Sequence, residues 1–198
     1  MSRKREGFAD PAEILSVADR VTRALSEAQI PNVLIGAAAM AIHGYVKSTA
    51  GVDLATAVEP TSALARIARR LAEEGLDAEY IHPDPDDPLG GVIRTWVTAE
   101  STVDVVNFLN PYRAGVESLL RDGLANAPAA QEGSPLRVMP LTHLIGLKLY
   151  AGGPQSVADV AELIRINGVP EAELRSFLAR FGLEERFDAV RAQLGDVL

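Results

Sequence analysis

The sequence contains no cysteine, so disulfide bonds and thiolate metal sites are excluded. A chain without cysteine suits a reducing compartment, and we expect a cytoplasmic location. Long apolar runs are also missing. No stretch approaches the roughly 20 residues that span a bilayer, which predicts that no membrane is a partner. Hydrophobic residues still make up 47% of the 198 residues, enough for the core of a globular protein.

Positive charge is scarce as well, because 19 Lys and Arg stand against 27 Asp and Glu, for a formal net charge of −8. Arg66, Arg69 and Arg70 form a dense basic cluster within a segment of helical apolar spacing, and a solvated helix face is the favoured interpretation. This charge balance argues against extended nucleic acid as a partner. It leaves open the binding of a small nucleotide or of the end of an RNA.

Apolar spacing and breaker residues divide the chain into a mixed α/β part and a helical part. We expect an α/β core over residues 1–139 and a C-terminal helical region over 140–198 that packs on it, which gives an α+β fold class. Two strands at 91–98 and 102–109 form a predicted hairpin. The other predicted strands are 32–35, 52–58, 78–81 and 137–139, and the predicted helices are 12–29, 37–42, 62–75, 113–122, 141–150, 157–166, 171–181 and 184–194.

A strand, a glycine and a helix follow one another at residues 33–42, with Gly36 and Ala37 at the junction. Free N–H groups at the start of a helix favour phosphate, and glycine lets phosphate approach the backbone closely. The same junction is common for purely structural reasons. The sequence has neither G-x-x-x-x-G-K-[ST] nor G-x-G-x-x-G, so P-loop and Rossmann interpretations lack their defining residues.

Two aspartates lie within otherwise apolar strand patterns. Asp53 follows Gly51 by two positions, so both residues share one face of their strand. Asp104 lies between valines, where a charged side chain is costly unless it is paired, hydrated or bound to a metal. The alternative is that its face of the strand meets solvent. We predict that the two strands are neighbours and that Asp53 and Asp104 face a common cleft.

Residues 35–54, with the sequence IGAAAMAIHGYVKSTAGVDL, resemble the signature of small bacterial AbiEii-type and minimal nucleotidyltransferases. That signature has a Gly-Gly or Gly-Ser pair, an alanine-rich helix with His-Gly near its end, an Arg-x-Thr and an Asp-x-Asp. Residues 144–151 resemble the family's helix that brings a lysine to the triphosphate, and residues 153–159 resemble its Arg-x-x-Asp-x-x-Asp. With the strand of Asp104, the resemblance covers residues 30–166.

The resemblance implies a nucleotidyltransferase fold with a C-terminal helical bundle. It also implies transfer of a nucleoside monophosphate from a nucleoside triphosphate to a hydroxyl, with two Mg²⁺ ions bridging three carboxylates. Asp53 matches the second of these carboxylates and Asp104 the third, so both are the expected catalytic and metal-binding residues. The residues that match nucleotide-binding positions are Gly36, Ala37, Lys47 and Lys148.

The sequence departs from the family at several polar positions. Gly51 stands where the first aspartate belongs, and the other replaced positions are Ala37, Lys47, Gly153 and Ser156, whereas Asp159 is retained. Because the apolar framework is intact, this pattern favours a fold that was kept after its chemistry was relaxed. A missing carboxylate could come from the proline-rich loop, although a solvated acidic loop is the favoured interpretation of Asp84, Asp86 and Asp87.

Two functions remain open. The first is an Mg²⁺-dependent nucleotidyltransferase whose catalysis is reduced or lost and whose Mg²⁺ binding is weak; an active enzyme with a one-metal reaction at Asp53 and Asp104 stays open. The second is a non-catalytic nucleotide-binding or protein-interaction module, such as one partner of a toxin–antitoxin pair. We also expect that Gly51→Asp restores the paired carboxylates. His43 and His143 are expected to have packing roles, and Trp96 is expected to lie in the core.

Overall fold

Five strands form one mixed sheet in the order β1-β2-β5-β4-β3. The computed structural model describes residues 5–59, 62–86, 89–112 and 115–194. Strands β2 and β5 run parallel, and the other neighbouring pairs are antiparallel. The strands are β1 (Val33–Ile35), β2 (Gly51–Thr56), β3 (Asp77–Ile81), β4 (Val92–Trp96) and β5 (Thr102–Asn107).

The strands that carry the two aspartates are adjacent, as predicted. Strands β2 and β5 pair with Asp53 opposite Asp104. The predicted hairpin is also confirmed, as the antiparallel pair β4 and β5. The predicted strand at 137–139 is wrong, because this segment makes only isolated bridges, one of them from Val138 to Leu34. Pro140, which has no N–H to donate, follows the segment directly.

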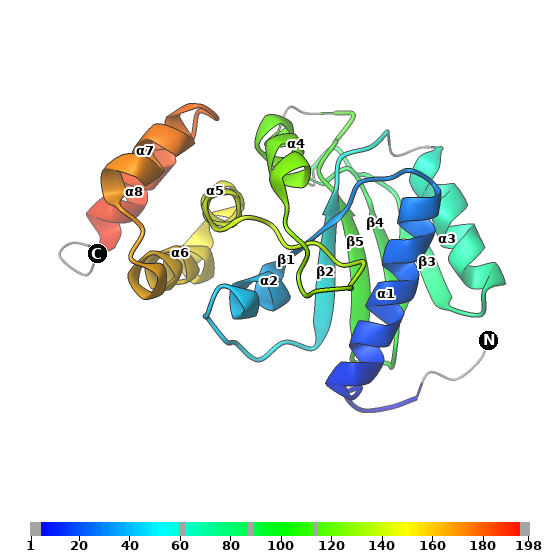
Figure 1. Cartoon of the computed structure of the whole chain (residues 1–198). Coiled ribbons are helices and arrows are strands. Elements are labelled where there is room, and N and C mark those ends of the chain that lie inside the picture. The colour runs from blue at the N-terminus through cyan, green and yellow to red at the C-terminus, as the bar shows by residue number, and fades with distance from the viewer. Residues whose placement is uncertain (1–4, 60–61, 87–88, 113–114, 195–198) are drawn as a thin grey trace.

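Helices cover the two faces of the sheet unequally (Figure 1). Helices α1 (Pro11–Glu27) and α3 (Ala63–Glu73) cover one face, and α2 (Gly36–Ile42), α4 (Glu117–Asn126) and α5 (Leu141–Ala151) lie on the other side. Ile93 and Val105 are fully buried, and their strands β4 and β5 contact α3 and α1 respectively. Because side chains alternate along a strand, their neighbours Arg94 and Asp104 point to the opposite face.

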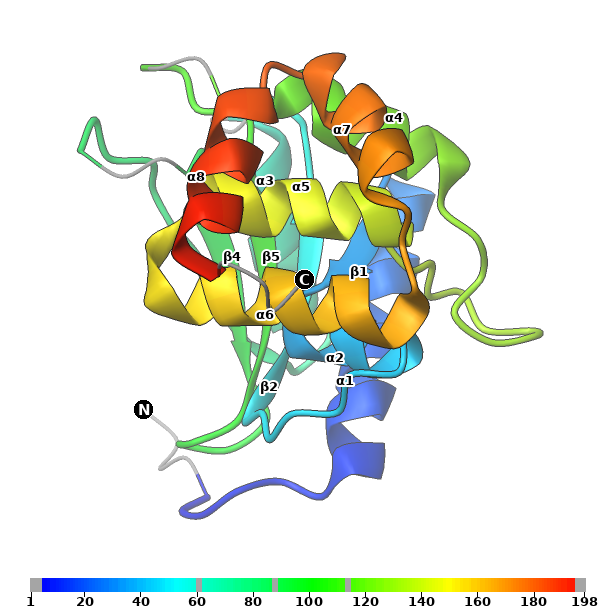
Figure 2. The ribbon, with the colours of Figure 1, turned by 90° about the vertical axis from the view of Figure 1, so that its left-hand side faces the viewer.

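Helices α5, α6 (Gly153–Asn167), α7 (Glu171–Ala179) and α8 (Glu184–Leu194) form the C-terminal helical region. In Figure 2, α5 and α6 lie side by side across the sheet, and α7 and α8 lie on their outer side. The α+β class is confirmed. Leu34 and Leu144, from the two parts of the chain, belong to one hydrophobic cluster. The division at residue 139 stays a prediction.

Three local predictions need correction. Helix α4 begins at Glu117, later than predicted, and residues 113–114 of the predicted helix lie outside the described ranges. Helix α6 begins at Gly153 instead of 157, because Pro154 fits the first turn of a helix, where no N–H is needed. Trp96 is only half-buried, since it alternates with the fully buried Thr95. None of the described helices has the length and apolar character needed to cross a membrane.

Candidate functional site

Four charged residues, one on each of four neighbouring strands, lie in register across the face of the sheet away from α1 and α3. Glu79 of β3 pairs with Arg94 of β4, Arg94 pairs with Asp104 of β5, and Asp104 pairs with Asp53 of β2. We call these residues the charged row. Neighbouring strands are about 4.8 Å apart, so each side chain can reach the next. The predicted position of Asp53 and Asp104 side by side on one face is therefore confirmed. Neither residue belongs to the lining of the neighbouring cleft, so the predicted shared cleft stays a prediction.

Arg94 binds Asp104 through both oxygens of the carboxylate. Its Nη2 donates to Oδ2 at 2.7 Å, and its Nε lies 3.1 Å from Oδ2 and 3.2 Å from Oδ1. The side chain of Asp104 is 12% exposed and that of Arg94 is 40% exposed. Arg94 was missed in the sequence. Its strand was predicted, but the predicted turn near residues 100–101 does not place residue 94 opposite residue 104, and only the observed register of β4 with β5 does so.

Asp53 lies at the end of the charged row, beside the junction of β1 and α2. Burial raises the pKa of the Asp53 carboxyl, and the neighbouring charge of Asp104 raises it further, while Lys148 and Arg94 partly offset both effects. Gly36 has a positive φ of 63°, and a Cβ at this position would overlap Oδ2 of Asp53. Gly36 therefore makes room for the carboxylate, and Ala37 follows it in the first turn of α2.

Asp53→Asn is expected to stabilise the protein by roughly 0.5–2 kcal/mol at pH 7, within the usual range for a stabilising substitution. The charged carboxylate is disfavoured in the folded state, because it is buried beside a like charge, and a neutral amide removes that cost. The gain should shrink as the pH falls through the raised pKa, where Asp53 itself becomes neutral. Urea unfolding at several pH values measures the difference. Equal or lower stability of the variant at pH 7 would contradict the expectation.

Lys47 and Lys148 converge on the buried Asp159 of α6. Nζ of Lys47 lies 2.6 Å from Oδ1 of Asp159, and Nζ of Lys148 lies 2.8 Å from Oδ2. Gln155 adds a hydrogen bond of 3.2 Å to Oδ1. Burial acts to raise the pKa of Asp159, but the hydrogen bonds from Lys148 and Lys47 outweigh it, so the pKa is lowered. Both lysines thus have an internal partner, which the sequence prediction did not include.

A cleft of about 460 Å³ lies between the sheet and the C-terminal helices. Its lining includes Gly36, Lys148 and Arg186 of α8. Arg186 donates a hydrogen bond of 2.7 Å to the carbonyl oxygen of Tyr150, and its Cζ lies 5.2 Å from the centre of the Tyr150 ring. Most of the remaining lining is apolar: Ile35, Leu89, Val106, Phe108, Leu144, Leu147 and Ala151.

Position 51 has no room for a side chain. A Cβ on Gly51 would overlap the carbonyl oxygen of Thr102 and would lie 3.2 Å from its hydroxyl oxygen. Glycine is therefore required by packing between β2 and β5. This finding corrects the expectation that an aspartate at 51 would simply complete the pair.

The acidic loop does not supply a third carboxylate from its described part. Asp84 is exposed, and its Oδ1 accepts a hydrogen bond of 2.8 Å from the backbone N–H of Asp86. Asp86 is exposed as well, and Asp87 lies outside the described residues. The two aspartates that are described fit the interpretation of a solvated loop.

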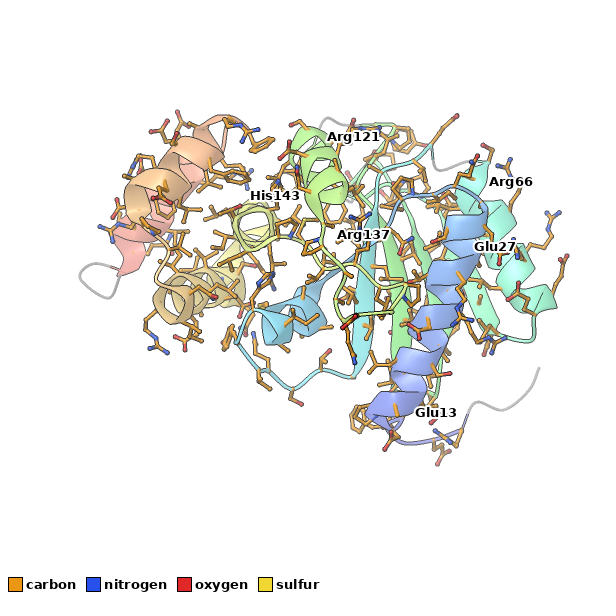
Figure 3. The ribbon with its side chains drawn as sticks, viewed as in Figure 1. Glu13, Glu27, Arg66, Arg121, Arg137 and His143 are labelled. Carbon is orange, nitrogen blue, oxygen red and sulfur yellow. The ribbon has the colours of Figure 1, made fainter. Side chains whose placement is uncertain are left out.

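His43 and His143 both have structural contacts. Nε2 of His43 lies 2.8 Å from the carbonyl oxygen of Met139, so His43 ties the end of α2 to the chain before α5. Nε2 of His143, which Figure 3 labels on α5, lies 2.7 Å from Oδ2 of Asp122 of α4. The expected packing roles are confirmed.

No family model and no curated protein matches this sequence. The solution structure of the antibiotic-resistance factor ANT(2'')-Ia has a TM-score of 0.55 and 14% identity, over 93% of this chain and 98% of that chain. An antigenic nucleotidyltransferase-like protein from Paracoccidioides brasiliensis has a TM-score of 0.52 and 14% identity, over 96% of this chain and 94% of that chain. The chain has the nucleotidyltransferase fold.

Families with the nucleotidyltransferase fold typically depend on Mg²⁺. The donors present here do not fit two such ions. Position 51 has no side chain, and Asp104 already accepts hydrogen bonds from Arg94 at both oxygens. Among the described residues, no group of three or more His, Asp or Glu side chains could hold a metal ion. That Asp53 and Asp104 bind a metal and act in catalysis stays a prediction.

Proposed function

We propose that this protein of nucleotidyltransferase fold binds a nucleoside triphosphate weakly and has lost conventional two-metal catalysis. One observation carries the proposal: the guanidinium of Arg94 binds both oxygens of Asp104. In two-metal sites the ions lie about 3.5–4 Å apart and stabilise the attacking and the leaving oxygens together. Because arginine holds Asp104 and glycine replaces the first aspartate at position 51, too few free carboxylate oxygens remain for that arrangement.

The cleft supports the nucleotide-binding part of the proposal. Its volume of about 460 Å³ falls within the usual range of roughly 300–1,000 Å³ for small-molecule sites. Apolar residues such as Val106 and Phe108 suit the flat face of a base, and Lys148 and Arg186 suit a negatively charged ligand.

Nucleotide binding is expected to be weak, with dissociation constants of roughly 0.1–1 mM, and to depend little on Mg²⁺. The measurement is calorimetric titration with ATP, GTP, CTP and UTP, each with and without Mg²⁺. An increase in affinity of more than about a hundredfold on adding Mg²⁺, roughly 2.7 kcal/mol, would contradict the proposal. So would robust transfer of labelled nucleoside monophosphate to any acceptor by the unaltered chain.

A matched pair of variants tests the position of the ligand. Lys148→Ala should weaken nucleotide binding by at least fivefold, because it removes a cation from the cleft lining. Both variants remove an ion pair with Asp159, because Lys47 and Lys148 each contact its carboxylate. Lys47 is absent from the cleft lining. A smaller effect of Lys47→Ala would therefore separate nucleotide contact from the loss of the Asp159 ion pair. Equal effects of the two variants would place the phosphates closer to Asp159 than we propose.

The second candidate function is a protein-interaction module, such as one partner of a toxin–antitoxin pair. Three apolar side chains are exposed near the contact of α2 with α6: Val46 is 80% exposed, Ile42 47% and Ile166 39%. A Cβ on Gly44 would lie 3.3 Å from Ile166, which puts these two segments side by side. Absence of binding for all four nucleotides at millimolar concentration would favour this candidate over the first.

A further inference from the structure

The charged row has an unusual sequence of charges across the sheet. Glu79, Arg94, Asp104 and Asp53 follow one another on β3, β4, β5 and β2. Arg94 therefore has a carboxylate on each neighbouring strand, Glu79 on β3 and Asp104 on β5, while Asp53 has only Asp104 beside it in the row. The Arg94 guanidinium lies against Asp104 through three contacts of 2.7–3.2 Å.

We propose that Arg94 takes the place of a divalent cation, and that the Asp53–Asp104 pair becomes a site for one such ion only when Arg94 leaves Asp104. The inference deepens the proposed function, because a site closed by arginine explains why two-metal chemistry is absent. A guanidinium has five N–H donors in a planar fork that matches a carboxylate, so it competes directly with a metal for the same oxygens. It also neutralises the charge that would attract the ion.

The surroundings of Arg94 allow it to leave. Its side chain is 40% exposed, whereas the side chain of Asp104 is 12% exposed. Glu79 is exposed on the strand at the other side of Arg94 and acts on it electrostatically. Rotation of the arginine toward Glu79 would exchange one carboxylate partner for another. The oxygens of Asp104 would then be free to bind an ion together with Asp53 on the neighbouring strand, and Gly36 keeps room for the Asp53 carboxylate.

The affinity of the full chain for Mn²⁺, measured by electron paramagnetic resonance in the absence of nucleotide, tests the inference. Arg94→Ala should raise Mn²⁺ affinity at least tenfold over the unaltered chain, and Arg94→Lys, which keeps a cation, should raise it less. Adding Asp53→Asn to Arg94→Ala should abolish the gain. Arg94→Gln removes the charge but keeps a donor for Asp104, so it gives a second measurement if the alanine variant unfolds.

The control for net charge is the variant Arg66→Ala. Arg66 is an exposed residue of α3, which lies on the opposite side of the sheet from α5 (Figure 3). The variant removes the same charge and should leave Mn²⁺ affinity unchanged. Equal affinity of Arg94→Ala and the unaltered chain would overturn the inference, and so would a gain that persists without the Asp53 carboxylate. Because no nucleotide is present, these outcomes are independent of whether the cleft binds a nucleoside triphosphate.

Discussion

Asp159→Asn is expected to lower the free energy of unfolding by about 2–3 kcal/mol at pH 7. Removing one partner of a buried ion pair typically costs about 3–5 kcal/mol, and the partial exposure of the two lysine side chains, 21% and 24%, reduces the cost here. The amide of the variant is uncharged, so Lys47 and Lys148 would lose their common counter-charge and repel each other. Thermal unfolding should show a fall in Tm of about 5–10 °C for a chain of this size.

The difference in stability between the unaltered chain and Asp159→Asn is expected to depend on pH. The pKa of Asp159 is lowered in the folded state, because hydrogen bonds from the lysines outweigh the effect of burial. Its contribution to stability is therefore fully present above the unfolded-state pKa of about 4 and is lost as the pH falls through the lower folded-state value. The difference in stability between the unaltered chain and Asp159→Asn should be constant near neutrality and should close below about pH 4.

Glu162→Gln is the matched control on the same helix. Glu162 pairs with Arg165 three residues later, in a surface contact where the arginine side chain is 60% exposed. Exposed pairs of this kind contribute about 0–1 kcal/mol, so the change in stability should be small. If Asp159→Asn cost no more than Glu162→Gln, the lysine–aspartate cluster would not hold α6 against the rest of the chain.

The fold could be predicted from the sequence where local patterns are strong. Asp53 and Asp104 each interrupt an apolar strand, and this pattern predicted that their strands would be neighbours, which the pairing of β2 with β5 confirms. Helix α2 and the hairpin of β4 and β5 were also predicted, from breaker residues and from the alternation of apolar residues. These features depend on short stretches of chain, where the period of the apolar residues determines the element.

The contacts of the candidate site could not be predicted in the same way, because they join residues far apart in the sequence. Lys47 meets Asp159 across 112 positions. The motif match assigned both lysines to nucleotide binding, but it contained no information on which buried carboxylate would face them. Arg94 was missed for a different reason. Its strand was predicted correctly, and only the exact register with β5 puts it on Asp104.

Gly51→Asp is expected to destabilise the protein by about 1–3 kcal/mol, as overpacking in a tight contact commonly does, and to leave Mn²⁺ affinity unchanged. The Cβ of any side chain at position 51 would overlap the carbonyl oxygen of Thr102, so the backbone of β2 or β5 must move before a carboxylate can reach the site. Even then, Arg94 would still occupy Asp104. Urea unfolding and Mn²⁺ titration measure the two effects separately.

Gly51→Ala separates the steric effect from the charge, because it adds the same Cβ without a carboxylate. Its loss of stability should match most of the loss in Gly51→Asp. The double variant Gly51→Asp/Arg94→Ala should bind Mn²⁺ no more tightly than Arg94→Ala alone, since the new carboxylate cannot approach Asp53 without displacing Thr102. A stable Gly51→Asp variant with at least tenfold tighter Mn²⁺ binding would show instead that β2 and β5 can separate at this point. In that case the missing aspartate, and not the arginine, would be what keeps the metal out.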